Sequence, residues 1–287
     1  LSREVSKVGL TSTSQNLDSY ACLNFARVQF FASFTFEHYN KAIECLEKSV
    51  VDDPQYAEAW QYYGFLLGWG YSIYGVYEKD ILTKALEAVQ KAIALDSAYA
   101  MAYRSKAEIE FYLGNFEQML KDGERALELS PNDSEVIGGV SYIMGLSGWG
   151  CHSSEKLKKK YNIDNKACDR LKKGHDLGVI GAKLDKVNRV PGNNFAQVAM
   201  HQDSKNWTKA LEVMEDLPIP SLWWWNHYMG TANHGLGNTE KAQAHFDKIA
   251  EILGDNTLAK IKRGMEIWHE MTVYEEMMPV YLEYGLK

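Results

Sequence analysis

The sequence lacks the short motifs by which many enzymes are identified. None of HExxH, GxSxG, a Walker phosphate loop or a dinucleotide-binding glycine pattern occurs in its 287 residues. Each of these motifs has a defined role in metal binding, nucleophilic attack or phosphate binding. Their absence does not exclude catalysis, but it favours a non-enzymatic chain that carries no cofactor.

Long apolar runs are also missing. The longest uncharged stretch, 59–77, contains four glycines, five tyrosines and Gln61, which suit helix packing better than lipid. We therefore expect no direct membrane insertion. The chain has 31 Lys and Arg against 38 Asp and Glu, a formal net charge of −7. This balance predicts no general affinity for nucleic acid.

Cysteine is scarce, and its spacing contains no CxxC motif of the zinc or redox kind. Buried free thiols are the expected state of Cys22, Cys45, Cys151 and Cys168, since a free cysteine behaves as a small apolar residue. Cys151 and Cys168 are the pair expected to form a disulfide if the compartment is oxidising. No metal site is predicted.

Positive charge is concentrated in one segment, 156–189, which has eleven Lys or Arg against four Asp. The Lys156–Lys160 run within it is a candidate contact for an acidic partner or a phosphate. The simpler interpretation is a solvated insertion.

Small residues recur at the spacing of a two-helix repeat. In that repeat an Ala is followed by a large apolar residue four positions later, a small residue three after that, and then a Pro. Ala42, Leu46, Ser49 and Pro54 fit this pattern. Small residues let two antiparallel helices approach closely, and Pro ends the second helix. Six units follow from the anchors Ala42, Ala85, Met119, Ala167, Ala210 and Ala242.

The first helix of the second unit carries Trp60, Tyr63, Gly64 and Leu67 in the W-x2-L-G-x2-Y order of tetratricopeptide repeats. We therefore predict an all-α, right-handed superhelical solenoid of about 13 helices with C-terminal capping helices. The predicted organisation is a polar leader (1–16) and one solenoid domain (17–287). Its units lie near 17–55, 56–98, 99–132, 133–180, 190–220 and 222–254, with a cap at 255–287.

The stretches 42–49, 53–60 and 91–96, with the Tyr- and Gly-rich insertion between them, resemble the C-terminal tetratricopeptide region of bacterial signalling proteins. The relevant proteins are winged-helix regulators of the CadC type and class III adenylate cyclases. The resemblance is best over 16–150 and 222–254 and poor over 151–220. It implies a sensory or partner-binding role, and it favours a periplasmic over a cytoplasmic location. It supplies no catalytic residue.

In such repeats the first helix of each unit lines the concave wall. Projection from the anchors predicts a binding surface that is aromatic with a few charges. Such a surface suits an extended peptide or a small molecule held by stacking and hydrogen bonds. The alternative is that these side chains pack against neighbouring helices. The predicted residues are Gln61, Phe65, Trp69, Arg104, Glu108, Tyr112, Tyr142, Trp224, His227, Thr231 and His234.

Two features of the last unit are unusual. The consecutive residues Trp223, Trp224 and Trp225 point about 100° apart on a helix, so they cannot all face one core. At least one is expected to reach the groove or a partner, unless Trp223 and Trp225 pack on the two adjacent units while Trp224 caps the insertion. His227 and His234 share a face about 10 Å apart, which is too far for one metal ion without a bridging ligand.

The sequence predicts a non-catalytic binding or sensory module whose ligand is a peptide, a protein or a small molecule. The alternative is a protein–protein scaffold that uses the convex face or the Lys-rich insertion. An enzyme built on a helical-repeat frame is the least favoured hypothesis. Nothing in the sequence identifies the ligand or the oligomeric state.

Overall fold

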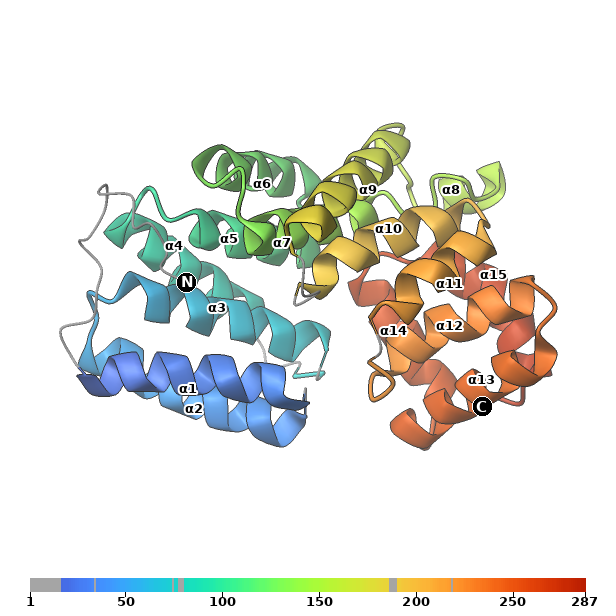
Figure 1. The fold of residues 1–287 in the computed structure, drawn as a ribbon, viewed down its shortest axis with the longest axis horizontal. Coiled ribbons are helices and arrows are strands. Elements are labelled where there is room, and N and C mark those ends of the chain that lie inside the picture. The colour runs from blue at the N-terminus through green and yellow to red at the C-terminus, as the bar shows by residue number, and fades with distance from the viewer. Residues whose placement is uncertain (1–16, 34, 74, 77–79, 186–189, 218) are drawn as a thin grey trace. The chain divides into compact units, whose positions relative to one another are not determined.

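A computed structural model describes residues 17–33, 35–73, 75–76, 80–185, 190–217 and 219–287. Fifteen helices and no strand occur among these residues, so the predicted all-α class is confirmed (Figure 1). None of these helices is both long and apolar enough to cross a membrane. The predicted leader lies outside the described residues. The chain divides into two compact units, residues 1–131 and 132–287, which are described separately.

The first unit consists of three helix pairs. Each first helix packs on the helix that follows it, and the first helices also contact one another. The turn 113–115 joins α5 to α6, so these two partners run antiparallel. The helices are α1 (Leu17–Ser33), α2 (Phe36–Asp52), α3 (Ala57–Ser72), α4 (Ile81–Leu95), α5 (Ala100–Tyr112) and α6 (Phe116–Leu129).

The second unit contains four pairs, which are α7 with α9, α10 with α11, α12 with α13, and α14 with α15. The short helix α8 lies in the Lys-rich insertion and was not expected. The helices are α7 (Ser134–Ser147), α8 (Glu155–Lys160), α9 (Ala167–Leu184), α10 (Pro191–Asp203), α11 (Trp207–Glu215), α12 (Trp223–Gly235), α13 (Thr239–Leu253), α14 (Thr257–Ile267) and α15 (Met271–Glu283).

The small-residue anchors lie where helices cross. All six are buried, with at most 2% of their surface exposed, and each lies on the second helix of a pair. Gly64 shows the reason for small residues, because a Cβ at this position would lie 2.7 Å from Val89 Cγ1 and 2.8 Å from the Ala85 carbonyl oxygen. The small residues Gly64 and Ala85 in the repeat pattern therefore indicate that α3 and α4 pack closely.

Glycine is also required at two turns. Gly114 follows α5 and Gly237 follows α12, and both have a φ of 77°, which L-residues with side chains rarely adopt. At each turn the amide after the glycine bonds back into the helix, from Asn115 to Glu110 and from Asn238 to Asn233. The Gly-Asn dipeptide at each turn is therefore the local sequence signal for the end of the helix.

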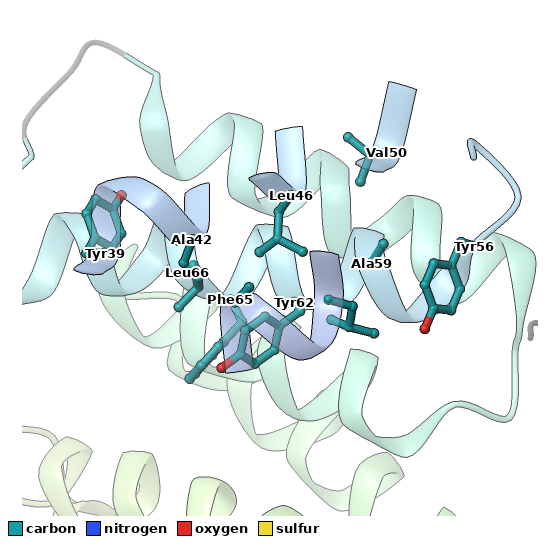
Figure 2. Packing of buried hydrophobic residues seen from close by; sticks show 11 residues of the cluster. Tyr39, Ala42, Leu46, Val50, Tyr56, Ala59, Tyr62, Phe65 and Leu66 are labelled. Atoms are coloured by element: carbon teal, nitrogen blue, oxygen red, sulfur yellow. The ribbon is translucent and has the colours of Figure 1, made fainter. Parts of the chain in front are cut away.

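The first core forms where α1, α2 and α3 meet. Figure 2 shows Ala42, Leu46 and Val50 of α2 facing Tyr62 and Leu66 of α3. Apolar residues at intervals of three and four place one face of each helix in this core. The cluster is aromatic on the α3 side, and this side continues into the predicted binding surface.

All four cysteines are paired in disulfides, contrary to the expectation of free thiols. Cys22 of α1 is joined to Cys45 of α2, with a Cα–Cα distance of 5.7 Å. Cys151 is joined to Cys168 across the Lys-rich insertion, with a Cα–Cα distance of 5.0 Å. Antiparallel pairing of α1 and α2 brings the first pair together, and sequence spacing alone did not indicate that contact.

Candidate functional sites

The predicted residues of the first unit form one cluster between α3 and α5. Three come from α3 and three from α5, and direct contacts connect them across the helix interface. Gln61, Phe65, Glu108 and Tyr112 are buried, whereas Trp69 and Arg104 are partly exposed. Their proximity follows from the packing of consecutive first helices. Their role in binding a ligand stays a prediction.

Arg104 is the charged centre of this cluster. Its guanidinium lies 4.7 Å from the centre of the Phe65 ring, within the range of a cation–π contact. Its Nη1 lies 3.1 Å from Oε2 of Glu108, one helical turn further along α5. Its buried Nε has no hydrogen-bond acceptor among the described residues. Arg104 is therefore fixed in position while one of its donors stays unpaired.

Glu108 links α3 to α5 by accepting two hydrogen bonds on Oε1. The Trp69 indole N–H donates over 3.0 Å, and the Tyr112 hydroxyl donates over 2.8 Å. A second link lies nearby, where the Gln61 amide donates to the Ser105 hydroxyl over 2.8 Å. Buried polar groups that are paired in this way hold the helix register and keep their side chains in one orientation.

The sequence interpretation missed Arg27, which extends this wall onto α1. Arg27 donates to Glu58 of α3 over 3.1 Å, and its side chain is 38% exposed. Arg27 stands fifteen residues before the anchor Ala42, the same interval that separates Arg104 from Met119. This equal spacing to the anchor could have identified Arg27 as the counterpart of Arg104 on α1. We call Arg27, Gln61, Phe65, Trp69 and Arg104 the first-helix wall.

The predicted residues of the second unit lie on α12 and α7. Trp224, His227 and Thr231 are buried, whereas His234 and Tyr142 are partly exposed. Tyr142 lies against Phe195, and the same Phe195 ring packs edge-on against Trp224 at 4.5 Å between centroids. His234 and the Tyr284 hydroxyl are 3.2 Å apart. Ligand binding by these residues stays a prediction.

The three consecutive tryptophans all lie against other aromatic rings. Trp223 stacks on Trp268 with centroids 5.4 Å apart, Trp224 lies edge-on against Phe195 and Trp268, and Trp225 lies edge-on against His245. The indole N–H groups of Trp224 and Trp225 are buried and have no acceptor among the described residues. Trp223 therefore packs beside the following helix pair, as the packing alternative has it, whereas Trp225 packs on α13 of its own pair and Trp224 packs on α10.

His227 is fully enclosed on α12. Its Nδ1 and the Tyr281 hydroxyl share a hydrogen bond of 3.0 Å, while its Nε2 has no partner among the described residues. Burial lowers the pKa of His227 to about 3, because the charged imidazolium loses its hydration. The side chain is therefore neutral at pH 7.

Glu270 is a buried carboxyl group that the sequence interpretation did not single out. The Tyr228 hydroxyl donates to its Oε1 over 3.0 Å, and none of its residue surface is exposed. Burial raises the pKa of Glu270 to about 8 and outweighs the opposite effect of the Tyr228 hydrogen bond. Tyr228 lies 42 residues earlier in the chain, so no local pattern connects the two.

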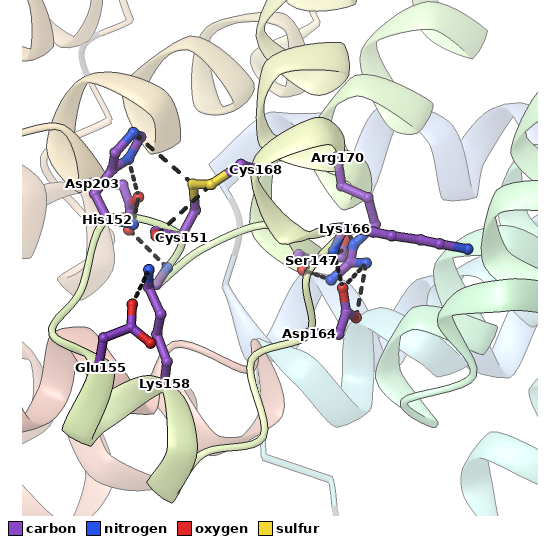
Figure 3. The surroundings of a disulfide bond; sticks show 11 residues. Ser147, Cys151, His152, Glu155, Lys158, Asp164, Lys166, Cys168, Arg170 and Asp203 are labelled. Carbon is purple, nitrogen blue, oxygen red and sulfur yellow. Dashed lines mark hydrogen bonds and ion pairs between the residues drawn. A yellow bond between two sulfur atoms is a disulfide. The ribbon is translucent and has the colours of Figure 1, made fainter.

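A pocket of about 610 Å³ opens in the Lys-rich insertion. Both cysteines of the second disulfide line it, together with Lys158 and Lys159 of α8 (Figure 3). Lys158 is paired with Glu155 at 3.0 Å. The wall of the pocket therefore combines sulfur, ammonium, amide and carboxylate groups, the last from Glu155 and Asp164.

Figure 3 also shows His152 and Asp203 beside this disulfide. His152 Nε2 lies 3.9 Å from Cys151 Sγ, and its Nδ1 lies 2.7 Å from Oδ2 of Asp203. Two backbone amides, those of Gly150 and His152, donate to the Asp203 carboxylate at 2.7 and 3.0 Å. The sequence interpretation missed this group because Asp203 is 51 residues from His152.

Comparison with known proteins gives similarity over parts of the chain. The chain is 25% identical over 125 residues to U-box domain-containing protein 70 of Oryza sativa, which is 40% of this chain and 16% of that protein. It is 27% identical over 128 residues to mitochondrial import receptor subunit TOM70 of Rattus norvegicus, which is 44% and 19%. No protein-family profile matches the sequence.

A TPR repeat-containing protein of Rhizobium etli is 31% identical over 64 residues, which is 22% of this chain and 31% of that protein. The chain spans less than a third of the length of each of these relatives. A solved tetratricopeptide repeat protein from Parabacteroides merdae superimposes with a TM-score of 0.47 and 11% identity, covering 95% of both chains. The sequence relatives support the tetratricopeptide repeat and a protein-binding module.

Proposed function

From its similarity to tetratricopeptide-repeat proteins, we propose that the chain is a non-catalytic module that binds an extended peptide of a protein partner. The proposed site is the first-helix wall. The Arg104 guanidinium carries the proposal, because Phe65 and Glu108 hold it in position while part of the residue stays exposed. A peptide carbonyl accepts a hydrogen bond from the exposed part of this guanidinium.

The spacing of the wall suits an extended chain. Packed helices lie about 8–10 Å apart, and an extended peptide rises about 3.3 Å per residue, so each first helix spans about three peptide residues. Arg27 on α1 and Arg104 on α5 then offer donors, whereas the buried Gln61 on α3, between them, already donates to Ser105. These donors match the backbone carbonyls that every peptide presents, whatever its sequence.

Phe65 and Trp69 supply the apolar part of the wall. Their rings lie 5.7 Å apart at an interplanar angle of 54°, and Trp69 is partly exposed. A tilted ring pair presents both a face and an edge, which suits one apolar peptide side chain between fixed polar groups. A small molecule on the same wall is the alternative ligand.

The test begins with selection of peptides from a displayed random library on the full chain, followed by titration of one selected peptide. We expect Arg27→Ala and Trp69→Leu to weaken its binding about tenfold or more. Arg27 is 38% exposed in its side chain, so its removal leaves the core intact. Helical circular dichroism checks the fold of each variant.

Arg125→Ala is the matched control. Arg125 also pairs with a carboxylate, Glu128, and also lies over an aromatic ring, Tyr103 at 6.0 Å, but it lies on the second helix α6. Its removal is expected to leave binding unchanged. Equal loss in Arg125→Ala and Arg27→Ala, or no loss in either wall variant, contradicts the proposal. Binding of metabolites and of no peptide favours the small-molecule alternative.

A finer proposal concerns the whole protein. The resemblance to CadC-type regulators and adenylate cyclases supports a sensory module of a bacterial signalling protein, and the two disulfides suit an oxidising compartment such as the periplasm. Expression of the native gene with an exported reporter fused to the chain tests this location. Reporter activity confined to the cytoplasm contradicts it.

The pocket in the Lys-rich insertion favours a second candidate function, a scaffold that holds an acidic partner. Lys158 and Lys160 are paired with Glu155 and Glu275 at 3.0 and 2.7 Å, so Lys159 is the pocket lysine to test. Lys159→Glu is expected to abolish binding of an acidic partner while leaving peptide binding at the first-helix wall unchanged. Retained binding of that partner excludes this site.

A further inference from the structure

The disulfide in the insertion lies among groups that bind metals. Cys151, His152 and Asp203 each place a ligand atom within 4.8 Å of the others, and Cys168 is bonded to Cys151. We propose that the chain, once this disulfide is reduced, binds one Zn²⁺ through Cys151 Sγ, Cys168 Sγ and His152 Nε2. The proposal concerns the second unit and does not depend on peptide binding.

The distances suit a tetrahedral ion. Zinc bonds of about 2.3 Å to sulfur and 2.0–2.1 Å to nitrogen place two such ligands roughly 3.6 Å apart. The observed separation of Cys151 Sγ and His152 Nε2 is 3.9 Å. The two cysteine Cα atoms are 5.0 Å apart, so side-chain rotation alone is enough to separate the freed sulfurs around an ion. The backbone already holds three ligands in place.

Asp203 orients the histidine for this role. Its Oδ2 lies 2.7 Å from His152 Nδ1, which leaves Nε2 directed at the sulfur. A carboxylate bonded to the far nitrogen of a ligating histidine fixes the ring and raises its basicity. The Asp203 side chain is 3% exposed and accepts two backbone N–H bonds, so it is held rigidly.

Three protein ligands leave one coordination position for water or for a bound molecule. Cys151 and Cys168 both line the pocket of about 610 Å³, and His152 is half exposed, so solvent reaches the site. Zinc sites with an open fourth position bind small anions and polar ligands. Two lysines and the carboxylates of Glu155 and Asp164 line the same pocket, so water or another small polar molecule suits this position.

The chemistry balances with a dithiol as the reductant. The dithiol reduces the Cys151–Cys168 bond to two thiols and itself becomes a cyclic disulfide. Zn²⁺ then displaces one proton from each thiol and accepts the His152 nitrogen lone pair. Two thiolates neutralise the charge of the ion, so the nearby Lys158 and Lys159 face no added positive charge. A small-molecule disulfide restores the Cys151–Cys168 bond by thiol–disulfide exchange, is itself reduced to two thiols, and thereby releases the ion.

The test titrates Zn²⁺ into the full chain, with and without prior reduction by a dithiol that is then removed under nitrogen. We expect one ion per chain in the reduced protein and none in the oxidised protein. His152→Ala and Cys168→Ser are each expected to weaken binding about 100-fold or more. Both side chains are exposed, so helical circular dichroism is expected to stay unchanged.

The double variant Cys22→Ser/Cys45→Ser is the matched control, because it removes the other cysteine pair. It is expected to keep full Zn²⁺ binding. The proposal is overturned if reduced wild-type chain binds no ion, if His152→Ala binds as tightly as wild type, or if the control loses the ion. Peptide binding at the first-helix wall is measured in parallel and is expected to be unaffected.

Binding of Co²⁺ in place of Zn²⁺ distinguishes a side chain that ligates the metal from one that only lies near it. Co²⁺ bound by two thiolates gives an intense sulfur-to-metal charge-transfer band, which Cys168→Ser is expected to reduce by about half. Asp203→Asn is expected to keep this band while weakening affinity about 10-fold to 100-fold, since it removes only the carboxylate behind His152. A lost band in Asp203→Asn contradicts the assigned role of Asp203.

Discussion

At the scale of single residues, the second unit contains two ionisable groups whose burial opposes their charged forms. Glu270 retains its proton up to a pKa of about 8, and His227 stays neutral down to a pKa of about 3. Both are therefore uncharged near pH 7. Their tyrosine partners, Tyr228 and Tyr281, are also buried, and burial raises the pKa of both hydroxyls. The part of the core formed by these four side chains is polar but electrically neutral.

This neutrality predicts a pH dependence with a definite sign. Between about pH 4.5 and 8 the folded chain keeps a proton on Glu270 that the unfolded chain loses, so stability from this group falls as pH rises. The loss is at most about 1.4 kcal/mol per pH unit. His227 has the opposite effect on stability. Its stabilising contribution is complete above its unfolded pKa of 6.5 and is lost as the pH falls towards its folded pKa of about 3.

Urea unfolding from pH 7.5 to 9 isolates the carboxyl group, since this range lies above the unfolded pKa of His227 and the imidazole is almost entirely neutral in both states. We expect the wild-type midpoint to fall over this range and the midpoint of Glu270→Gln to stay nearly constant, because the amide has no proton to lose. Glu251→Gln, at an exposed carboxyl group, serves as control and is expected to follow wild type. A wild-type midpoint that rises above pH 7 contradicts the assignment.

The sequence could not identify these residues. Glu270 accepts a hydrogen bond from Tyr228, 42 positions away, and His152 is hydrogen-bonded to Asp203, 51 positions away. The environment of each side chain is set by that distant partner. Periodicity reports which face of a helix is buried, but it does not report which distant side chain lies opposite. By contrast Gln61, Phe65 and Arg104 were found because the register relative to the anchors fixes their face.

At the scale of helices, the small-residue pattern was the most informative part of the sequence. It located the close crossings because only Ala, Gly and similarly small residues let two helices approach. The insertion was harder to predict, since α8 has no anchor and lies where the repeat pattern is interrupted. Its Ser154 cap, whose hydroxyl accepts from the Leu157 amide, was the available local signal.

The crossing of α3 and α4 gives a sharp prediction. Gly64→Ala is expected to destabilise the fold by about 1–3 kcal/mol, because its Cβ would meet Val89 and the Ala85 backbone below 3 Å. Gly68→Ala, one turn later, places its Cβ at an ordinary 3.6 Å from Ile109. It is expected to be neutral or stabilising, since Ala favours the helix by about 1 kcal/mol.

Thermal or urea unfolding of the two alanine variants measures this difference. Both changes add one methyl group to the same helix, so helix propensity cancels between them. Equal stability of the two variants means that close approach at Gly64 does not limit the fold. A more stable Gly64→Ala variant contradicts the packing described for this crossing.

At the scale of the whole molecule, contacts between distant segments join the insertion to the C-terminal helices of the second unit. Glu275 of α15 accepts from Lys160 over 2.7 Å and from Tyr161 over 2.6 Å. These two hydrogen bonds lower the pKa of Glu275, and the bond from Lys160 has the larger effect. The insertion is therefore tied to a helix that lies more than 100 residues later.

Removing this tie is expected to loosen the insertion locally. Glu275→Gln is expected to raise amide hydrogen exchange over 155–163 on the order of threefold, because partly exposed ion pairs contribute less than about 1 kcal/mol. Exchange in the first unit is expected to stay constant. Glu251→Gln, which removes an exposed pair within α13, is the control. Unchanged exchange over 155–163 shows that the link is not needed to order the insertion.

The Glu275 link also has a consequence for the order in which the chain is completed during synthesis. Residues 155–161 leave the ribosome more than 100 residues before Glu275, so the insertion emerges without the side chain that later holds it. Cys151 and Cys168 are both present during that interval. The disulfide, or an ion bound by the reduced pair, can therefore order this segment long before its helical neighbour exists.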